Sequence, residues 1–282
     1  PTRFVSNYGD VEQSGFGGVI VENRMLGEMY LRQPYRGNGS YSEGKPDINA
    51  GPVDGMIRTE SDMAWVKAMI ADGYKFNGVT KVAKDQLWYG DLIYADANGD
   101  GNYGDTNDMN FTGTSTQPRY NFGLNLSVAY KGFDFYMLWA GSAGFDLYWN
   151  HSSYNGTRTE NGFGISQRVA DNHYFYNPEN PSDSRTNITA KYPRITDQTQ
   201  RDNGTSSVFW KYKGDYVKLK NIQIGYTIPV KWTRKFMVEK LRFYFSGENL
   251  LTITSYPGLD PEMGTSITYP LTRQFAFGAQ LS

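Results

Sequence analysis

The sequence predicts an all-β fold, a transmembrane antiparallel β-barrel of which this chain supplies a part, and three observations support it. Several long segments alternate apolar side chains with small or polar ones, which is the two-residue period of a β-strand. Aromatic residues make up 16% of a chain whose mean hydropathy is only -0.60, as expected when an apolar outer band with aromatic girdles surrounds a polar lumen. The connections alternate between short and long, like the two ends of an outer-membrane barrel.

Composition narrows the functional classes but does not decide between two folds. The formal net charge of -1 offers no basic face for nucleic acid, and the absence of cysteine excludes disulfides, thiol catalysis and cysteine metal sites. No segment contains the about 18 consecutive apolar residues that a transmembrane helix needs. A secreted β-sandwich with an aromatic binding face would have a similar composition, so the pattern along the chain has to decide.

The first clear pair of strands starts at Tyr120. Over residues 120–130 one parity is apolar, and the other carries only Gly, Asn, Ser and Ala. Residues 131–132, Lys-Gly, then make a two-residue turn into a second apolar segment at 133–139, which predicts a tight hairpin. The apolar parity of the first strand consists of Phe122, Leu124, Leu126, Val128 and Tyr130.

Three more strands with the same alternation are expected nearer the C-terminus, at 216–228, from Leu241 onward and at 271–282. The first two are joined by a short connection. Lys218 and Lys220 share the parity of the apolar residues of their strand. They are therefore expected to face outward just above the hydrocarbon, where a cation is tolerated.

The opposite parity of these strands decides between the two folds. It carries Gln, Ser, Asn, Gly, Arg and Glu, which suits a water-filled lumen and not the dry core of a sandwich. The short connections at 131–132 and 229–240 are assigned to the periplasm, and the long ones to the outside. We therefore expect C-terminal barrel strands over 120–282, with a long extracellular loop at 144–214.

Upstream of these strands the pattern is less regular. Residues 54–119 are expected to form an extracellular loop region containing a short helix over 60–71, with Thr59 or Ser61 as its N-cap. Residues 1–53 are a poorly defined strand and loop region, with weak strand signals at 17–22 and 27–35. The predicted buried side of the helix consists of Trp65, Ala68 and Met69.

An Asp-rich segment, Asp-Ala-Asn-Gly-Asp-Gly at 96–101, matches the opening of a calcium loop. A standard loop closes with an acid at the position held here by Asn107, and Asp108 follows one residue later. The alternative is an Asx-rich turn whose carboxylates are solvated or accept backbone N–H groups. The candidate calcium ligands are Asp96, Asn98, Asp100 and Asp108, with Asn102 through its backbone carbonyl.

No catalytic constellation is present, so an enzyme is not expected. His151 and His173 lie in the long loop without the spacing of metal ligands, and no glycine-rich loop precedes a helix that would bind phosphate. One cluster of rings in the same loop has two interpretations, stacking on sugar rings at the outer mouth or packing within the loop. It consists of Tyr154, Tyr174, Phe175 and Tyr176.

Several segments resemble the SusC/RagA family of TonB-dependent outer-membrane transporters, in the family's order. These include GDLIYADANGDG at 90–101, NLSVAYKGFDF at 125–135 and DYVKLKNIQIGYTIP at 215–229. The strongest are SGENLL at 246–251 and YPGLDP at 256–261. Together with shorter matches at 54–57 and 113–123, they cover most of residues 54–282.

This resemblance implies the C-terminal part of a barrel of about 22 strands, a multi-pass protein of the bacterial outer membrane. It also implies import of a glycan or oligosaccharide, or of a peptide, beneath a SusD-like surface lipoprotein. TonB would drive import through a plug region outside this chain. An open sheet exposes edges and a lipid face, which the remaining barrel and plug segments and outer-membrane lipid must cover.

The alternative function is a secreted, calcium-stabilised β-domain that binds carbohydrate. Among transporters, a glycan or peptide importer is favoured over a siderophore or cobalamin importer, and copurification of a SusD-like lipoprotein would discriminate between the two. Solubility without detergent, together with polysaccharide binding by the chain alone, would favour the secreted domain.

Overall fold

The computed structural model describes residues 24–43, 47–149, 165–195, 203–265, 269 and 271–281. They fall into two compact units. The sheet unit is Ser115–Leu147 with Tyr212–Ser282, and the loop unit is Thr2–Thr114 with Tyr148–Lys211. No helix among the described residues is long and apolar enough to cross a bilayer.

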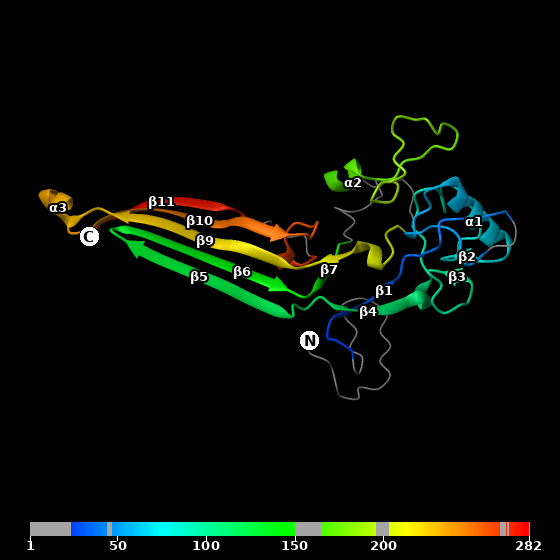
Figure 1. Cartoon of the computed structure of the whole chain (residues 1–282), viewed down its shortest axis with the longest axis horizontal. Helices are drawn as coiled ribbons and strands as arrows, with labels where there is room; N and C mark the ends of the chain where they lie inside the picture. Colours follow the sequence, from blue (N-terminus) through cyan, green and yellow to red (C-terminus); the bar gives the residue numbers. More distant parts are fainter. Residues whose placement is uncertain are drawn as a thin grey trace. The chain divides into compact units, whose positions relative to one another are not determined.

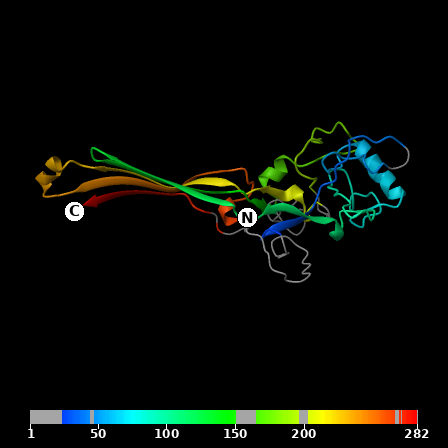
Figure 2. The same ribbon diagram turned by 60° about the horizontal axis from the view of Figure 1, so that its bottom comes forward.

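The sheet unit contains a five-stranded antiparallel sheet in the order β11-β10-β9-β6-β5. Figure 1 shows the strands side by side, with the β5–β6 turn and the β9–β10 connection at the same end. In both views no helix of this unit covers either face of the sheet (Figures 1 and 2). The strands are β5 (Tyr120–Tyr130), β6 (Phe133–Ala143), β9 (Tyr216–Thr227), β10 (Leu241–Thr254) and β11 (Gln274–Leu281).

The structure contains all five strands that the alternation predicts. β6 runs four residues beyond the predicted Trp139, and β11 starts at Gln274, three residues later than expected. The β5–β6 turn has positive φ at both Lys131 (45°) and Gly132 (88°), the backbone of the tight hairpin turn that matches strand twist. A Cβ at Gly132 would lie 2.7 Å from the carbonyl oxygen of Thr227, so glycine is needed there.

The register places most of the apolar side chains of the five strands on one face. Phe122, Ile224 and Phe275, which would share a dry core in a sandwich, are 49%, 46% and 63% exposed. The eleven residues of β5 span about 33 Å along the strand and about 25 Å when tilted by about 40°, the height of a barrel's apolar band. This apolar face comprises Phe122, Leu124, Leu126, Val128 and Tyr130 of β5, Phe133, Phe135, Met137 and Trp139 of β6, Val217, Leu219, Ile222, Ile224 and Tyr226 of β9, Phe243, Phe245, Leu251 and Ile253 of β10, and Phe275 and Phe277 of β11.

The prediction that Lys218 and Lys220 face outward is wrong, because a β-bulge interrupts β9. The consecutive β6 residues Leu138 and Trp139 pair with Asn221 and Leu219, which leaves Lys220 as an extra residue of β9. One inserted residue reverses the parity. Leu219 therefore joins the apolar face, and Lys218 joins the polar face.

The polar face of the sheet carries an ion pair that spans three strands. Arg242 Nε of β10 donates to Asp134 Oδ1 of β6 at 2.9 Å, passing over Gly225 of the intervening strand β9. A Cβ at Gly225 would lie 2.5 Å from the Arg242 guanidinium, so only glycine leaves room for the pair. Charges of this kind suit the lumen side of a barrel wall.

The loop unit is built from short elements around one helix. β1 pairs with β4 and β2 with β3, while β7 and β8 pair with each other and fall mostly within the residue ranges of the sheet unit. The elements are β1 (Glu28–Arg32), α1 (Glu60–Ala71), β2 (Lys75–Phe76), β3 (Asn102–Tyr103), η1 (Thr106–Asp108), β4 (Met109–Ser115), β7 (Asp146–Tyr148), α2 (Gln167–Asp171), η3 (Val208–Trp210) and β8 (Lys211–Lys213). The weak strand signal at 27–35 contains β1, and the one at 17–22 lies outside the described residues.

Helix α1 has the predicted bounds and the predicted cap. The Thr59 side chain accepts a hydrogen bond from Asp62 N, and the Asp62 carboxylate accepts one from Thr59 N, which completes a capping box. Trp65 and Met69 are fully buried as expected, and Trp65 stacks on Tyr35 with ring centroids 4.8 Å apart. Met63 and Val66 are buried in place of Ala68, which is partly exposed.

Residues 148–211, most of the segment predicted as one long loop, are structured where they are described. Asp91, from the Gly-Asp-Leu motif, is fully buried and accepts hydrogen bonds from Arg194 Nε at 2.6 Å and Asn203 Nδ2 at 2.9 Å. Tyr174 and Trp210 are each 1% exposed. The buried carboxylate thus ties two distant parts of this segment to the motif.

A charge placed on either face of β5 tests which face meets lipid. Leu126→Arg, near the middle of the apolar face, should lower the free energy of unfolding from lipid vesicles by about 2–4 kcal/mol. Ser127→Arg, its neighbour on the opposite face, is the matched control and should change stability far less. Unfolding titrations of the full-length protein in vesicles measure both, and equal losses for the two variants would refute the assignment of faces.

Candidate functional site

A row of aromatic side chains crosses four strands at the end of the sheet that carries the short connections. The register pairs Tyr130 with Phe133, Phe133 with Tyr226, and Tyr226 with Phe243. The rings of Phe133 and Tyr226 lie 4.5 Å apart, and Tyr130 and Phe133 are 67% and 59% exposed. Such a row is typical of the border between hydrocarbon and lipid headgroups, where an amphipathic ring meets both.

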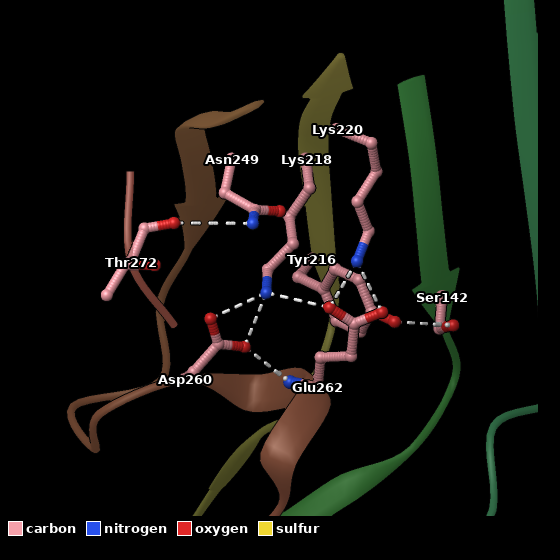
Figure 3. Close-up of polar contacts among 8 residues, drawn as sticks. All are labelled: Ser142, Tyr216, Lys218, Lys220, Asn249, Asp260, Glu262 and Thr272. Atoms are coloured by element: carbon pink, nitrogen blue, oxygen red, sulfur yellow. Dashed lines mark hydrogen bonds and ion pairs between the residues drawn. The ribbon is translucent and has the colours of Figure 1, made fainter. Parts of the chain in front are cut away.

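An ion-pair cluster lies at the other end of the sheet, next to the β9 bulge (Figure 3). Lys218 Nζ donates to Asp260 Oδ1 at 2.6 Å and to Glu262 Oε2 at 2.9 Å, and Lys220 Nζ donates to Glu262 Oε1 at 2.6 Å. Asp260 caps the short helix η5 (Pro261–Met263) by accepting a hydrogen bond from Glu262 N at 2.8 Å. The bulge therefore aims two ammonium groups at the segment that follows β10.

Burial decides how much each contact in this cluster stabilises the structure. The Lys218 side chain is 2% exposed and that of Asp260 11%, so each charge depends on the other after losing water. Lys220 is 26% exposed and Glu262 35%, so solvent screens that pair. Desolvation would raise the pKa of Glu262, but hydrogen bonds from Lys220 and Lys218 outweigh it and hold the pKa below the ordinary value.

The five predicted calcium ligands lie close together in the loop unit, and their carboxylates accept backbone N–H groups. Asp96 Oδ1 accepts from Gly99 N at 2.7 Å, and its Oδ2 accepts from Gly101 N at 2.8 Å. Asp108, 1% exposed, closes the loop by accepting from Ala97 N at 2.6 Å and Gly104 N at 2.7 Å. Further contacts join Asn98 to Asp100, Asp100 to Asn102 N, and Asn102 to Gly78 N and Asp105.

This arrangement is an Asx-rich turn that brings several carboxylates close together. Among the described residues, no group of three or more His, Asp or Glu side chains is placed to hold a metal ion. The acidic charge also affects Tyr103. Burial makes the largest contribution and the neighbouring Asp96 and Tyr74 add to it, so the pKa of Tyr103 is raised to about 12. The calcium site stays a prediction.

The ring cluster predicted in the long loop contributes to a cleft of about 300 Å³ in the loop unit. Tyr174 packs inward, 1% exposed, and its hydroxyl donates to the Arg58 carbonyl oxygen at 2.6 Å. Tyr176 donates to Glu60 Oε1 at 2.8 Å. Tyr154 and His151 lie outside the described residues. The aromatic lining of the cleft consists of Trp88, Tyr89, Tyr174, Phe175 and Tyr176.

His173 also lines this cleft, and the described residues form no metal-binding group around it. Its Nδ1 lies 2.7 Å from the carbonyl oxygen of Ala170, so Nδ1 carries a proton when it donates there. The cleft can therefore contact a ring-shaped ligand by stacking and through a few polar groups, which is a binding arrangement.

Sequence reasoning missed the partners of Lys218 and of Asp91. Asp260 and Glu262 lie in the YPGLDPE segment and Asp91 in the Gly-Asp-Leu motif. Both motifs carried the family resemblance, so their acids were visible as unusual charges. Their partners come from more than 40 residues away in the chain, a separation no local pattern reports.

Comparison with known proteins decides the family. No family model matches the chain. TonB-dependent receptor P3 of Formosa agariphila is 30% identical over 233 residues, which cover 74% of this chain and 21% of that protein. TonB-dependent receptor P39 of the same organism is 27% identical over 289 residues, covering 95% of this chain and 26% of that protein. The chain is a partial homologue of the TonB-dependent receptors.

This chain spans about a quarter or less of the length of the relatives it matches. It also shares a fold with part of the RagAB peptide transporter, with 22% identity, a TM-score of 0.50, and coverage of 68% of this chain and 21% of that one. TonB-dependent receptors are non-enzymatic proteins of the outer membrane. The homology to these receptors confirms the predicted family, outer-membrane location and absence of enzyme activity, and the secreted carbohydrate-binding alternative loses its support.

Substitution of the buried Lys218 tests the ion-pair cluster. Lys218→Ala should leave Asp260 buried without its counter-ion, which should lower the stability of this segment by about 3–5 kcal/mol. Lys220→Ala, the matched control on the exposed side of the cluster, should cost about 0–1 kcal/mol. Hydrogen exchange of residues 256–264 in the full-length protein reports the local opening. Similar exchange in the two variants would show that the buried pair does not hold this segment.

The lowered pKa of Glu262 predicts a pH dependence of the same segment. Because its folded-state pKa is depressed, Glu262 stabilises the structure above the unfolded pKa of about 4.3, and the contribution is lost as pH falls through the folded value. The difference in exchange protection between wild type and Glu262→Gln should therefore be constant above about pH 5 and vanish at lower pH. A difference that persists in strong acid would contradict this sign.

Proposed function

We propose that this chain is the C-terminal part of the barrel of a SusC/RagA-type transporter, a barrel of about 22 strands. The transporter would import a glycan, an oligosaccharide or a peptide, with a SusD-like lipoprotein as its outer lid and TonB as its source of energy. The observation that carries the proposal is the two-faced sheet, which exposes aliphatic and aromatic side chains on one side and charges on the other.

The edges of the sheet support a closed barrel. β5 and β11 each pair on one side only among the described residues. An unpaired strand edge cannot lie in hydrocarbon, because nothing there satisfies its N–H and C=O groups. Further strands outside the described sheet would therefore pair with β5 and with β11 and close the sheet into a barrel.

The cleft of the loop unit supports a glycan or a peptide as the cargo. Its lining combines aromatic rings with Asn177, Glu179 and His173. Sugar rings stack on aromatic faces and offer hydroxyls to such polar groups, and an aromatic residue of a peptide would use the same surface. The RagAB peptide transporter, which shares part of the fold, makes a peptide one of the two classes to test.

Copurification and uptake test the proposal together. The full-length protein, tagged and extracted from outer membranes in detergent, should bring down a surface lipoprotein. A deletion strain should lose uptake of at least one oligosaccharide or peptide from a labelled panel, and collapse of the proton gradient should abolish that uptake in the wild type. A protein that is soluble without detergent, or a deletion strain with unchanged uptake of the whole panel, would overturn it.

A structural calcium ion on the Asp-rich loop is a second, separate proposal, supported by the concentration of carboxylates at Asp96, Asp100 and Asp108. The ion would bind Asp96, Asn98, Asp100, the Asn102 carbonyl and Asp108, and its charge would offset their mutual repulsion.

Calcium should then stabilise the full-length protein, by about 2.7 kcal/mol at about 100 times the dissociation constant. Melting curves in calcium and in chelator measure the shift. Asp100→Asn should abolish it, whereas Asp85→Asn, an exposed acid outside the loop, should not. An unchanged melting temperature in wild type would reduce the loop to a turn held by backbone hydrogen bonds.

A further inference from the structure

The connection between β9 and β10 exposes large apolar side chains although its backbone is ordered by short helices. α3 (Val230–Thr233) and η4 (Arg234–Phe236) lead into Met237, a non-glycine residue with a φ of 56°. The small side chain of Thr233 points inward, 4% exposed, while Trp232, Phe236 and Met237 are 59%, 78% and 96% exposed. A turn that only joined two strands would place its small residues outward and its rings inward.

The same connection is the most basic short segment of the sheet unit. Four cations, Lys231, Arg234, Lys235 and Lys240, face one acid, Glu239, which gives +3 within a chain whose net charge is -1. All five are exposed. Within the described part of the chain, Lys231, Arg234 and Lys235 form no ion pair, so their charge is available to a partner outside the chain.

The aromatic row fixes the depth of this segment relative to a bilayer. Pro229 follows Tyr226, a member of the row, by only three residues, and Figure 1 shows α3 at the end of the sheet that also holds the β5–β6 turn. The apolar face of the sheet meets hydrocarbon up to that row. Residues 230–238, the anchor segment, therefore begin at the level of the lipid headgroups.

We propose that the anchor segment binds the anionic phospholipid headgroups of the adjacent leaflet, with its rings and Met237 inserted among the acyl chains and its cations on the phosphates. Charge complementarity and continuity with the lipid-facing sheet single out lipid. A protein partner would need about 800 Å² of surface from each side, more than three side chains provide. The proposal rests on the membrane-spanning sheet and goes beyond import.

Site-directed fluorescence in the full-length protein tests the anchor segment. This chain has no cysteine. With any cysteine outside this chain replaced by serine, Met237→Cys places one thiol for a fluorophore. The protein is reconstituted in phosphatidylethanolamine vesicles that contain either doxyl-labelled phosphatidylglycerol or the same fraction of doxyl-labelled phosphatidylcholine. The ratio of quenching by the two lipids reports enrichment of anionic lipid. About five-fold enrichment is expected for each engaged cation.

Two triple variants separate the anchor from general charge. Lys231→Gln/Arg234→Gln/Lys235→Gln should bring the ratio close to one, while Lys67→Gln/Lys75→Gln/Lys81→Gln, which removes three exposed cations of the loop unit, should leave it unchanged. Equal quenching by both lipids in the labelled Met237→Cys protein, no quenching by either, or an enrichment that survives loss of the three anchor cations would each overturn the proposal. Uptake is not part of the readout, so failure here is distinct from failure of the transport proposal.

Discussion

The alternation of side chains across a paired strand is the constraint on which the rest of this structure depends. Hydrocarbon offers no hydrogen-bond partner, so a backbone that crosses it must be fully paired, and pairing forces successive side chains to opposite faces. A lysine facing lipid costs about 2–4 kcal/mol at mid-depth and about 0–1 kcal/mol near the interface. The bulge at Lys220 avoids that cost because it turns Lys218 from the apolar face to the polar one, where Asp260 receives it.

The bulge also connects the sheet to the segment that follows β10. Lys218 and Lys220 reach the two acids of the segment after β10, so one extra residue in β9 both corrects the parity and fixes the start of a long connection. In the loop unit the buried Asp91 has the same kind of role for Arg194 and Asn203. In both places a motif acid holds distant chain segments, and removing its partner would leave a buried charge uncompensated.

The parts of this fold that local physics dictates are visible in the sequence. β5 and its turn follow from period-two alternation and Lys-Gly, and α1 follows from Thr59, Asp62 and a spaced apolar stripe. The bulge is invisible to the same reasoning, because it depends on what lies opposite Lys220 in β6 and β10. The partners of Asp260 and Asp91 are likewise set by tertiary contacts. The Asp-rich loop is visible in the sequence, but a one-dimensional spacing cannot distinguish an ion from backbone N–H groups as the partner of Asp108.

Spin-label scanning along β9 tests the central claim most directly. Single cysteines at each position from 216 to 227 of the full-length protein, reconstituted in lipid, would report accessibility to oxygen in hydrocarbon and to a water-soluble nickel chelate. The account predicts oxygen maxima at Ile222, Ile224 and Tyr226, a phase reversal at Lys220, and maxima again at Val217 and Leu219. An unbroken alternation that leaves Lys218 in phase with Ile222, or uniform protection from both reagents, would contradict it.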